Sequence, residues 1–147
     1  MNIHEVLEQK GKQIETVRPV RRLEEIVALF AARNISSVVV VNADDRPLGI
    51  VTDRIVIAAL ARHGRETLNL SAADVMQSPA PACETGDSLQ SAMQMMTARR
   101  VRHLLVQRGG EMAGVVSIGD LVKARIRDAE LENNVLRDLT AAHMTAA

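Results

Sequence analysis

Apolar residues recur at helical spacing twice in this chain, roughly 65 residues apart. The offsets i, i+3, i+4 and i+7 are taken in the first half by Leu23, Ile26, Val27 and Phe30, and in the second half by Leu89, Ala92, Met93 and Met96. This spacing puts each set of side chains on one face of a helix. The pattern therefore predicts two amphipathic helices that belong to two copies of one unit.

Aliphatic strands follow each predicted helix. "ISSVVVV" begins at Ile35 and "VRHLLVQ" at Val101; after a turn, a second strand ends in "GIVT" or "GVVS" and leads into another helical segment. With a short first strand near Val17 or Cys83, each copy is predicted to be β-α-β-β-α. Because the strands are apolar at successive positions, both of their faces should be buried. We therefore expect an α/β fold in which the two copies pack face to face about a pseudo-two-fold axis.

The chain divides into three predicted parts: a first motif over residues 1–70, a second over 71–128 and a C-terminal helical tail over 129–147. The lead-in "EVLEQKGK" before the first copy matches "DVMQSPAP" before the second, where Ser71 and Asp74 have the spacing of a capping box. In the tail, apolar residues recur every four positions, at Leu131, Val135 and Leu139. We expect this stripe to pack on the domain or on a partner chain.

Composition narrows the classes of function. The formal net charge is zero and the chain has one Phe but neither Tyr nor Trp, which argues against nucleic-acid binding by summed positive charge or by base stacking. The single cysteine, Cys83, permits no intrachain disulfide and is interpreted as a small core residue, so a reducing, cytoplasmic setting is expected. The charged N-terminal segment does not resemble a secretory signal, and no apolar run is long enough to span a membrane.

Catalytic patterns are absent from the sequence. The four histidines are dispersed and have no cysteine at zinc spacing. We find no nucleophile–base pair and no Gly-rich phosphate-binding loop of the Walker type. The sequence therefore predicts a protein that is not an enzyme and requires no metal or cofactor.

A hydroxyl and an acid stand where the last strand of the second copy leads into its final helix. Ser117 lies beside helix-start N–H groups that suit a phosphate, and Asp120, one turn later, can accept hydrogen bonds from a ribose diol. Arg102 and His103, at a strand start in the same copy, could supply cationic donors to phosphate oxygens. Simpler roles stay open: Ser117 and Asp120 as a plain capping box, Arg102 at a solvated helix end, and His103 as a half-buried histidine.

The second copy also contains an ordered set of segments: Val75-Met76, "LQSAMQMM", "RRVRHLLV" and "GVVSIGDLV". Together these resemble the CBS domain, named for cystathionine β-synthase, and the pair resembles a Bateman module of the stand-alone bacterial type. The resemblance implies a non-catalytic regulatory module that binds AMP, ADP, ATP, S-adenosylmethionine or NAD(H) in clefts between the motifs. It also implies adenine contacts near Ala82, disk-like homodimers, and signalling in trans to an unidentified effector protein.

The first copy departs from this pattern. Thr52 aligns with Ser117, but Ile55 stands where the second copy has its acid, and two serines align with Arg102 and His103. Arg54 either reaches a phosphate across the cleft or pairs with an acid on the surface. We therefore predict one competent adenosine site per chain, in the second motif, where the cations favour a nucleotide over S-adenosylmethionine. The alternative is a structural or oligomerisation module with degenerate clefts.

Overall fold

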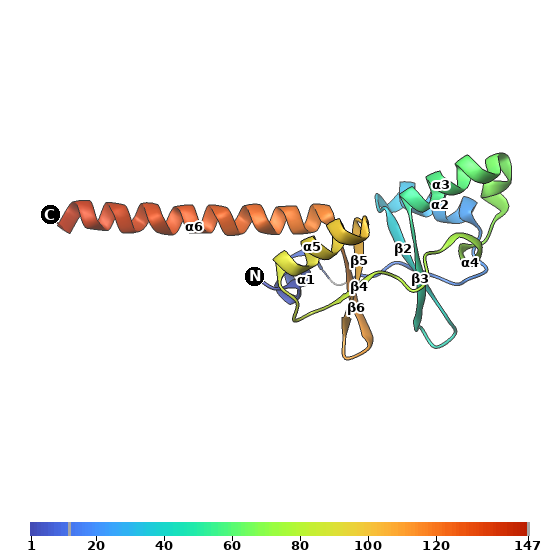
Figure 1. Cartoon of the computed structure of the whole chain (residues 1–147), viewed down its shortest axis with the longest axis horizontal. Coiled ribbons are helices and arrows are strands. Elements are labelled where there is room, and N and C mark those ends of the chain that lie inside the picture. The colour runs from blue at the N-terminus through green and yellow to red at the C-terminus, as the bar shows by residue number, and fades with distance from the viewer. Residues whose placement is uncertain (12, 147) are drawn as a thin grey trace.

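Two three-stranded sheets form the body of the molecule, and the computed structural model describes residues 1–11 and 13–146 (Figure 1). The first motif consists of β1 (Thr16–Val17), α2 (Leu23–Arg33), β2 (Ser37–Val41), β3 (Pro47–Thr52) and α3 (Asp53–His63). The second consists of β4 (Ala82–Glu84), α5 (Leu89–Arg99), β5 (His103–Arg108), β6 (Glu111–Ser117) and α6 (Ile118–Ala146). In both sheets the first strand runs parallel to the second, and the second antiparallel to the third. The predicted α/β fold, with a β-α-β-β-α unit written twice, is confirmed.

The central strands are buried on both faces, as their unbroken apolar sequence predicts. Val38 and Val40 of β2 pack in the core of the first motif, beneath its helices. Val39 and Val41 point the other way and pack with Leu105 of β5, so that the two sheets meet. Val39 and Leu105 occupy equivalent places, each in the strand that pairs with the first strand of its own sheet. Equivalent residues therefore meet at the interface, as a pseudo-two-fold axis requires.

Each half of the sequence contains one short helix that packs in the core of the other half. α1 (Ile3–Lys10) precedes the first motif in the sequence, yet its apolar residues, including Leu7, are buried in the core of the second motif. α4 (Ala72–Val75) follows the 3₁₀ helix η1 (Gly64–Asn69) and packs through Ala72 into the core of the first motif. The capping box predicted at Ser71 and Asp74 opens α4. A division at residue 70 therefore separates each short helix from the core that it completes.

Two equivalent glycines allow α1 and the segment that follows α4 to pack closely on the sheets. A Cβ atom at Gly49 would lie 2.6 Å from the main-chain oxygen of Gln77, which follows α4. A Cβ atom at Gly114 would lie 2.6 Å from Cδ2 of Leu7 in α1. Real Cβ atoms do not come so close to other heavy atoms, so both positions depend on the missing side chain.

Alanine at the two glycines should cost unequal amounts of stability. Gly49→Ala should lower the free energy of unfolding by about 1–3 kcal/mol, because the added methyl group meets main chain that also pairs with Ile50. Gly114→Ala should cost less, because the end of the Leu7 side chain can move aside. Urea denaturation of the two variants measures the difference, and equal losses would contradict this account.

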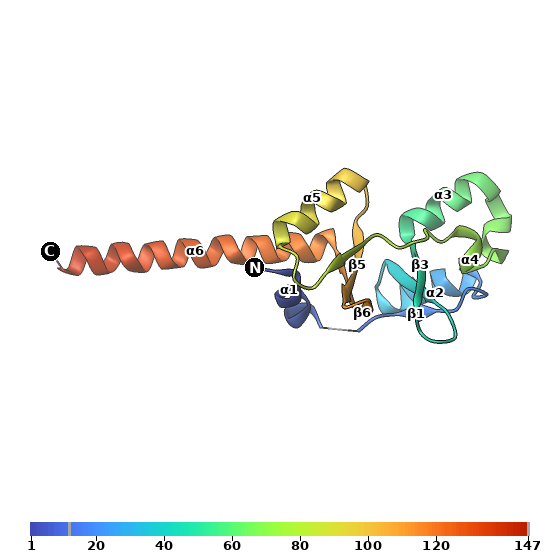
Figure 2. The same ribbon diagram turned by 60° about the horizontal axis from the view of Figure 1, so that its bottom comes forward.

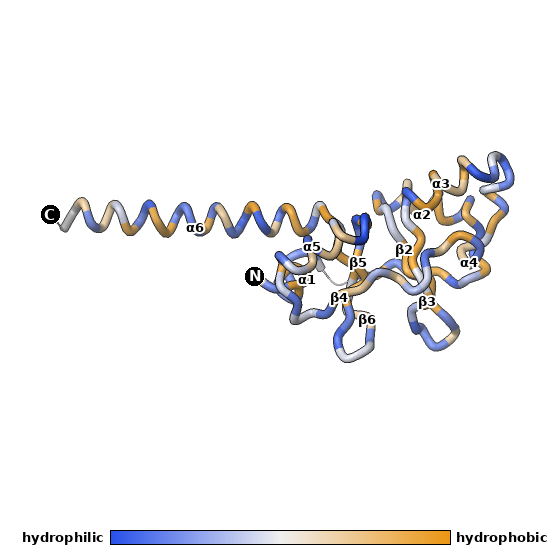
Figure 3. Tube along the Cα trace, in the orientation of Figure 1, coloured by the Kyte–Doolittle hydropathy of each residue, from blue (hydrophilic) through white to orange (hydrophobic). Residues whose placement is uncertain are grey.

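α6 continues far beyond the domain. It is one helix of 29 residues, whose start packs on the second motif through Leu121 and Ala124 and whose remainder projects away (Figures 1 and 2). Along this projection apolar and polar residues are mixed (Figure 3), and Leu131, Val135 and Leu139 are about 60% exposed (60%, 57% and 62%). The predicted tail is thus a continuation of α6, with Ala147 outside the described residues, and its stripe does not pack on the domain. None of the described helices, α6 included, is long and apolar enough to cross a membrane.

Candidate functional site

The turn from β6 into α6 joins Ser117 and Asp120. The main-chain N–H of Ser117 donates to Oδ2 of Asp120 at 2.8 Å, and the N–H of Asp120 donates to Oγ of Ser117 at 3.2 Å. This reciprocal pair is the geometry of a capping box, so the predicted capping role is confirmed. It also fixes the carboxylate at the edge of a cleft between the two motifs.

This cleft, which we call the Asp120 cleft, has a volume of about 470 Å³. Ser117 and Asp120 line one side of it, and residues 13–15 and 34–37 of the first motif line the other. Its volume falls in the range of small-molecule sites, roughly 300–1,000 Å³. The cleft therefore combines an acid and several hydroxyl groups in a space large enough for a small ligand.

Lys10, the last residue of α1, lies in this cleft. It was not predicted from the sequence as a site residue. Its Nζ is 2.7 Å from Oδ2 of Asp120 and donates to the main-chain oxygen of Val115 at 2.6 Å. Burial by itself raises the pKa of Asp120, but the hydrogen bonds from Lys10 and Ser117 outweigh burial and leave the pKa below its usual value. Asp120 is therefore ionised at neutral pH. No sequence signal identified Lys10, because only the exchange of α1 brings it to the second motif.

His103 lies between the two motifs and lines both of their clefts. The residue is only 8% exposed, and its Nε2 is 2.9 Å from Oγ of Ser36. Burial is the main cause that lowers the pKa of His103, and Arg102 and Lys10 lower it further. At neutral pH the imidazole is therefore a neutral hydrogen-bonding group rather than the cationic donor expected from the sequence.

A second, smaller cleft lies at the start of α3. Its volume is about 230 Å³, and we call it the arginine cleft because Arg54, Arg100 and Arg102 line it. Thr52 and Ile55 lie in its wall. Thr52 caps α3 by accepting a hydrogen bond from the N–H of Ile55 at 3.3 Å, as Ser117 does for the N–H of Asp120. The predicted alignment of the two turns is confirmed, and the acid is absent from the first.

Each cleft is formed by a turn of one motif and residues of the other motif. The turn of the second motif faces Ser36 and Ser37, whereas the turn of the first motif faces Arg100 and Arg102. Contrary to expectation, Arg102 does not share a cleft with Asp120: its guanidinium lies 3.7 Å from the carboxylate of Asp53, in the first turn of α3. The three arginines therefore gather in the cleft where Ile55 stands in place of an acid equivalent to Asp120.

Ala82 also lies outside the Asp120 cleft. It packs between the two sheets, in the cluster that contains Val39 and Leu105. The lead-in to the second sheet reaches the arginine cleft through Pro81, and the lead-in to the first sheet reaches the Asp120 cleft through residues 13–15. The main chain that could contact a ring bound beside Asp120 is thus that of the first motif.

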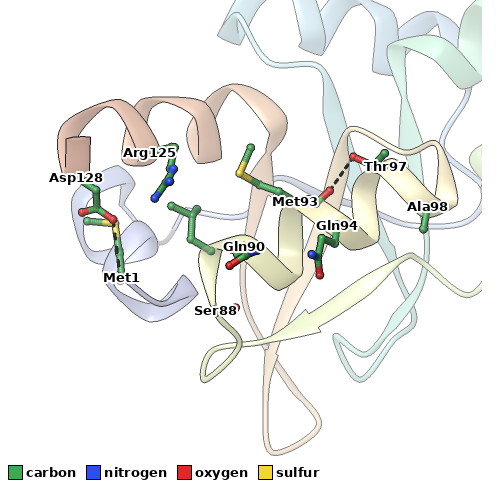
Figure 4. Close-up of a pocket in the computed structure, with 10 residues that line it drawn as sticks. Met1, Ser88, Gln90, Met93, Gln94, Thr97, Ala98, Arg125 and Asp128 are labelled. Carbon is green, nitrogen blue, oxygen red and sulfur yellow. Dashed lines mark hydrogen bonds and ion pairs between the residues drawn. The ribbon is translucent and has the colours of Figure 1, made fainter. Parts of the chain in front are cut away.

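A larger groove, of about 710 Å³, lies elsewhere, between α5, the start of α6 and the N-terminus (Figure 4). An ion pair of 4.0 Å joins the amino group of Met1 to Asp128 at one end. The other side chains that line it are mostly uncharged, with Arg125 as the exception, and none belongs to the predicted site. This groove is larger than the Asp120 cleft, but it is not lined by a turn with a capping hydroxyl and an acid like that of Ser117 and Asp120.

Other reactive groups do not form a site in the part of the chain that the structure describes. Cys83 is buried in the core of the second motif, and burial raises the pKa of its thiol to about 12, so it is an inert core residue, as predicted. No group of three His, Cys, Asp or Glu side chains among the described residues could hold a metal ion.

Comparisons with known proteins agree with the fold and the repeat. The sequence profile of the CBS domain matches residues 11–62 and 72–127. A CBS-domain-containing protein from Agrobacterium tumefaciens is 35% identical and superposes with a TM-score of 0.82, over 84% of this chain and 92% of that chain. A CBS domain protein from Pyrobaculum aerophilum, solved in complex with AMP, is 24% identical and superposes with a TM-score of 0.72, over 82% of this chain and 89% of that chain.

Curated relatives are longer than this chain. A mitochondrial CBS-domain-containing protein of Arabidopsis thaliana is 29% identical over 71% of this chain, which spans 52% of that relative. The chain spans 58% and 41% of two further relatives, from Methanopyrus kandleri and Thermofilum pendens. The two profile matches cover both repeated units, and the chain therefore belongs to the CBS domain family, as a tandem pair of motifs.

Proposed function

We propose that this chain is a regulatory module that binds an adenosine-containing ligand in the Asp120 cleft and signals to a partner protein in trans. The observation that carries the proposal is the fixed, ionised carboxylate of Asp120 at the edge of a cleft between the motifs. Oδ2 accepts from Ser117 and Lys10, whereas Oδ1 accepts no hydrogen bond from any residue that the structure describes. A ribose hydroxyl can therefore donate to Oδ1 without breaking the existing contacts.

The remaining walls of the cleft suit the rest of such a ligand. Ile14, Ile35 and Val115 offer apolar surface for an adenine ring, which suits a chain without Tyr or Trp. Lys10 provides a cation within the cleft, in place of Arg102, and suits a phosphate group. AMP, ADP, ATP and NAD(H) all carry both a ribose and a phosphate, and they are the ligands that we propose.

The family supports a regulatory role. Tandem CBS domains are regulatory modules and are generally not catalysts, and the Pyrobaculum aerophilum relative is solved with AMP. A homodimer is part of the proposal as well, because the exposed stripe at Leu131, Val135 and Leu139 offers apolar surface to another chain. The ligand, the partner and the dimer are inferences from these features.

Asp120→Ala should weaken ligand binding by about ten- to a hundredfold, because a hydrogen bond to a charged group is worth on the order of 1.5–3 kcal/mol. Isothermal titration calorimetry with AMP, ADP, ATP and NADH measures the effect. Asp138→Ala, which removes an exposed carboxylate from the projecting part of α6, serves as the matched control and should leave affinity unchanged.

A thermal-shift panel separates this function from a purely structural module. A ligand that binds the folded chain raises its melting temperature in a concentration-dependent way. If none of the four compounds raises the melting temperature of the wild-type chain, the ligand-binding proposal is wrong and the structural alternative is favoured.

A further inference from the structure

We infer that α6 pairs with α6 of a second copy of this chain as a parallel, in-register, two-stranded coiled coil. The inference rests on the homodimer of the proposed function, and it assigns that dimer to one helix face and one orientation. We call this face the α6 seam, and its residues are Val122, Ile126, Ala129, Asn133, Leu136, Thr140 and His143.

The spacing of the α6 seam is that of a coiled coil. Successive seam residues are alternately four and three positions apart, which is the spacing of the core positions a and d of a heptad. Ile126, Asn133 and Thr140 take the a positions, and the other seam residues take the d positions. Every seam residue is exposed, and Val122, Ile126 and Leu136 are 41%, 53% and 61% exposed. Their apolar surface is buried only when another helix lies along this face.

The face with Leu131 and Val135 is less suited to a second helix. At the start of α6 the same face packs on the domain through the buried Leu121 and Ala124. Asp128 also interrupts it with a carboxylate. A partner helix along that face would meet the domain, whereas the α6 seam is exposed along its whole length (Figures 1 and 2). In the proposed pair, Leu131 and Val135 stay open to a further partner.

Charges beside the α6 seam favour a parallel pair. In this arrangement the residue at each g position faces the following e position of the other helix, and opposite charges there set the orientation of the pair. The rule places Arg125 opposite Glu130 of the second copy, and Glu132 opposite Arg137 of the second copy. Both pairs are attractive, and none of the four side chains forms an ion pair with any residue that the structure describes.

Asn133 favours the same register. A polar Asn at a single a position lowers the stability of a coiled coil but specifies its register and oligomeric state. In a parallel, in-register pair, Asn133 meets its own copy, and each amide has a donor and an acceptor for the other. A shift by one heptad would place Asn133 opposite Ile126, and an antiparallel pair would place it opposite a d residue. Either alignment would leave buried amide groups without partners.

Disulfide trapping of the full chain tests the pairing. Leu136→Cys should form a linked dimer on mild oxidation, because equal d positions lie opposite each other in the proposed pair. Leu131→Cys is the matched control, since Leu131 is 60% exposed against 61% for Leu136 and lies on the other face of the same helix. It should be trapped at least about tenfold more slowly. The native Cys83 is buried and does not compete.

A charge exchange tests the orientation independently. Glu132→Lys should weaken the dimer by about fivefold, because it would oppose Arg137 of the second copy with a like charge. Adding Arg137→Glu to the same chain should restore the affinity, since the exchanged pair is again attractive. Sedimentation equilibrium measures dimerisation of each variant, and circular dichroism confirms that each is folded.

The outcomes separate this inference from the proposed function. A wild-type chain that stays monomeric would contradict both the proposed homodimer and the coiled coil. A dimer in which Leu131→Cys is trapped as fast as Leu136→Cys, or in which the charge exchange restores nothing, would overturn the coiled coil alone. Failure of the chain to bind adenosine compounds is measured by calorimetry, and it is therefore distinguishable from either result.

Discussion

Ile55→Asp should give the chain a second binding site for an adenosine-containing ligand. Ile55 stands at the same place in the first turn of α3 as Asp120 does in α6, three residues after a capping hydroxyl. An aspartate there should accept from the N–H of Thr52, as Asp120 accepts from that of Ser117. The arginines already in this cleft would then hold the phosphate of a ligand whose ribose the new carboxylate binds.

The expected result is one additional equivalent of AMP per chain in calorimetry. Affinity for the first cleft should rise by about ten- to a hundredfold, the value of a hydrogen bond to a charged group.

Ile55→Asn is the matched control, since it has nearly the shape of aspartate without its charge. It should cost the same apolar packing, because Ile55 contacts the core of the first motif, but it should add little affinity. An unchanged stoichiometry and affinity in folded Ile55→Asp would show that the acid is not what the first cleft lacks.

Leu7→Ala should lower the free energy of unfolding by about 2–5 kcal/mol, the usual cost of truncating a buried leucine. Leu7 is 1% exposed and lies against Gly114, in the core of a motif that begins more than sixty residues later in the sequence. Urea denaturation measures the loss, and hydrogen exchange should show it first in β6 and α5.

Glu5→Ala is the control for this experiment, because Glu5 lies in the same helix and is exposed. It should change stability by a few tenths of a kcal/mol. A loss of less than about 1 kcal/mol in Leu7→Ala would contradict the view that α1 completes the second motif. By the same reasoning, a fragment cut at residue 11, where the first family match begins, should be less stable than the whole chain.

Local patterns predicted most of the fold. Successive apolar residues such as Val38 and Val39 indicated strands buried on both faces, and the packing of the two sheets follows from that. The turn at Ser117 was recognisable because a hydroxyl and an acid three residues apart form a local capping box. The lack of an equivalent acid in the first motif was predictable in the same way, because Ile55 stands three residues after Thr52.

Contacts between the halves were not predictable in the same way. Whether Arg102 faces Asp120 or Asp53 depends on how one motif docks against the other, and the spacing within a motif does not encode that geometry. Lys10 reaches Asp120 only because α1 packs on the second motif. A repeat pattern assigns residues to copies, whereas the binding clefts are shared between copies.

α6 runs without a break from the Asp120 cleft to the far end of the projecting helix. Asp120 lies in its first turn, and a helix of 29 residues is about 44 Å long at 1.5 Å per residue. A tilt of about 5° at the cleft end would therefore sweep the far end through about 4 Å, if the helix moved as a straight rod. A tilt too small to disturb the core would thus displace the far end of α6, although the fixed end of the helix lies at the Asp120 cleft.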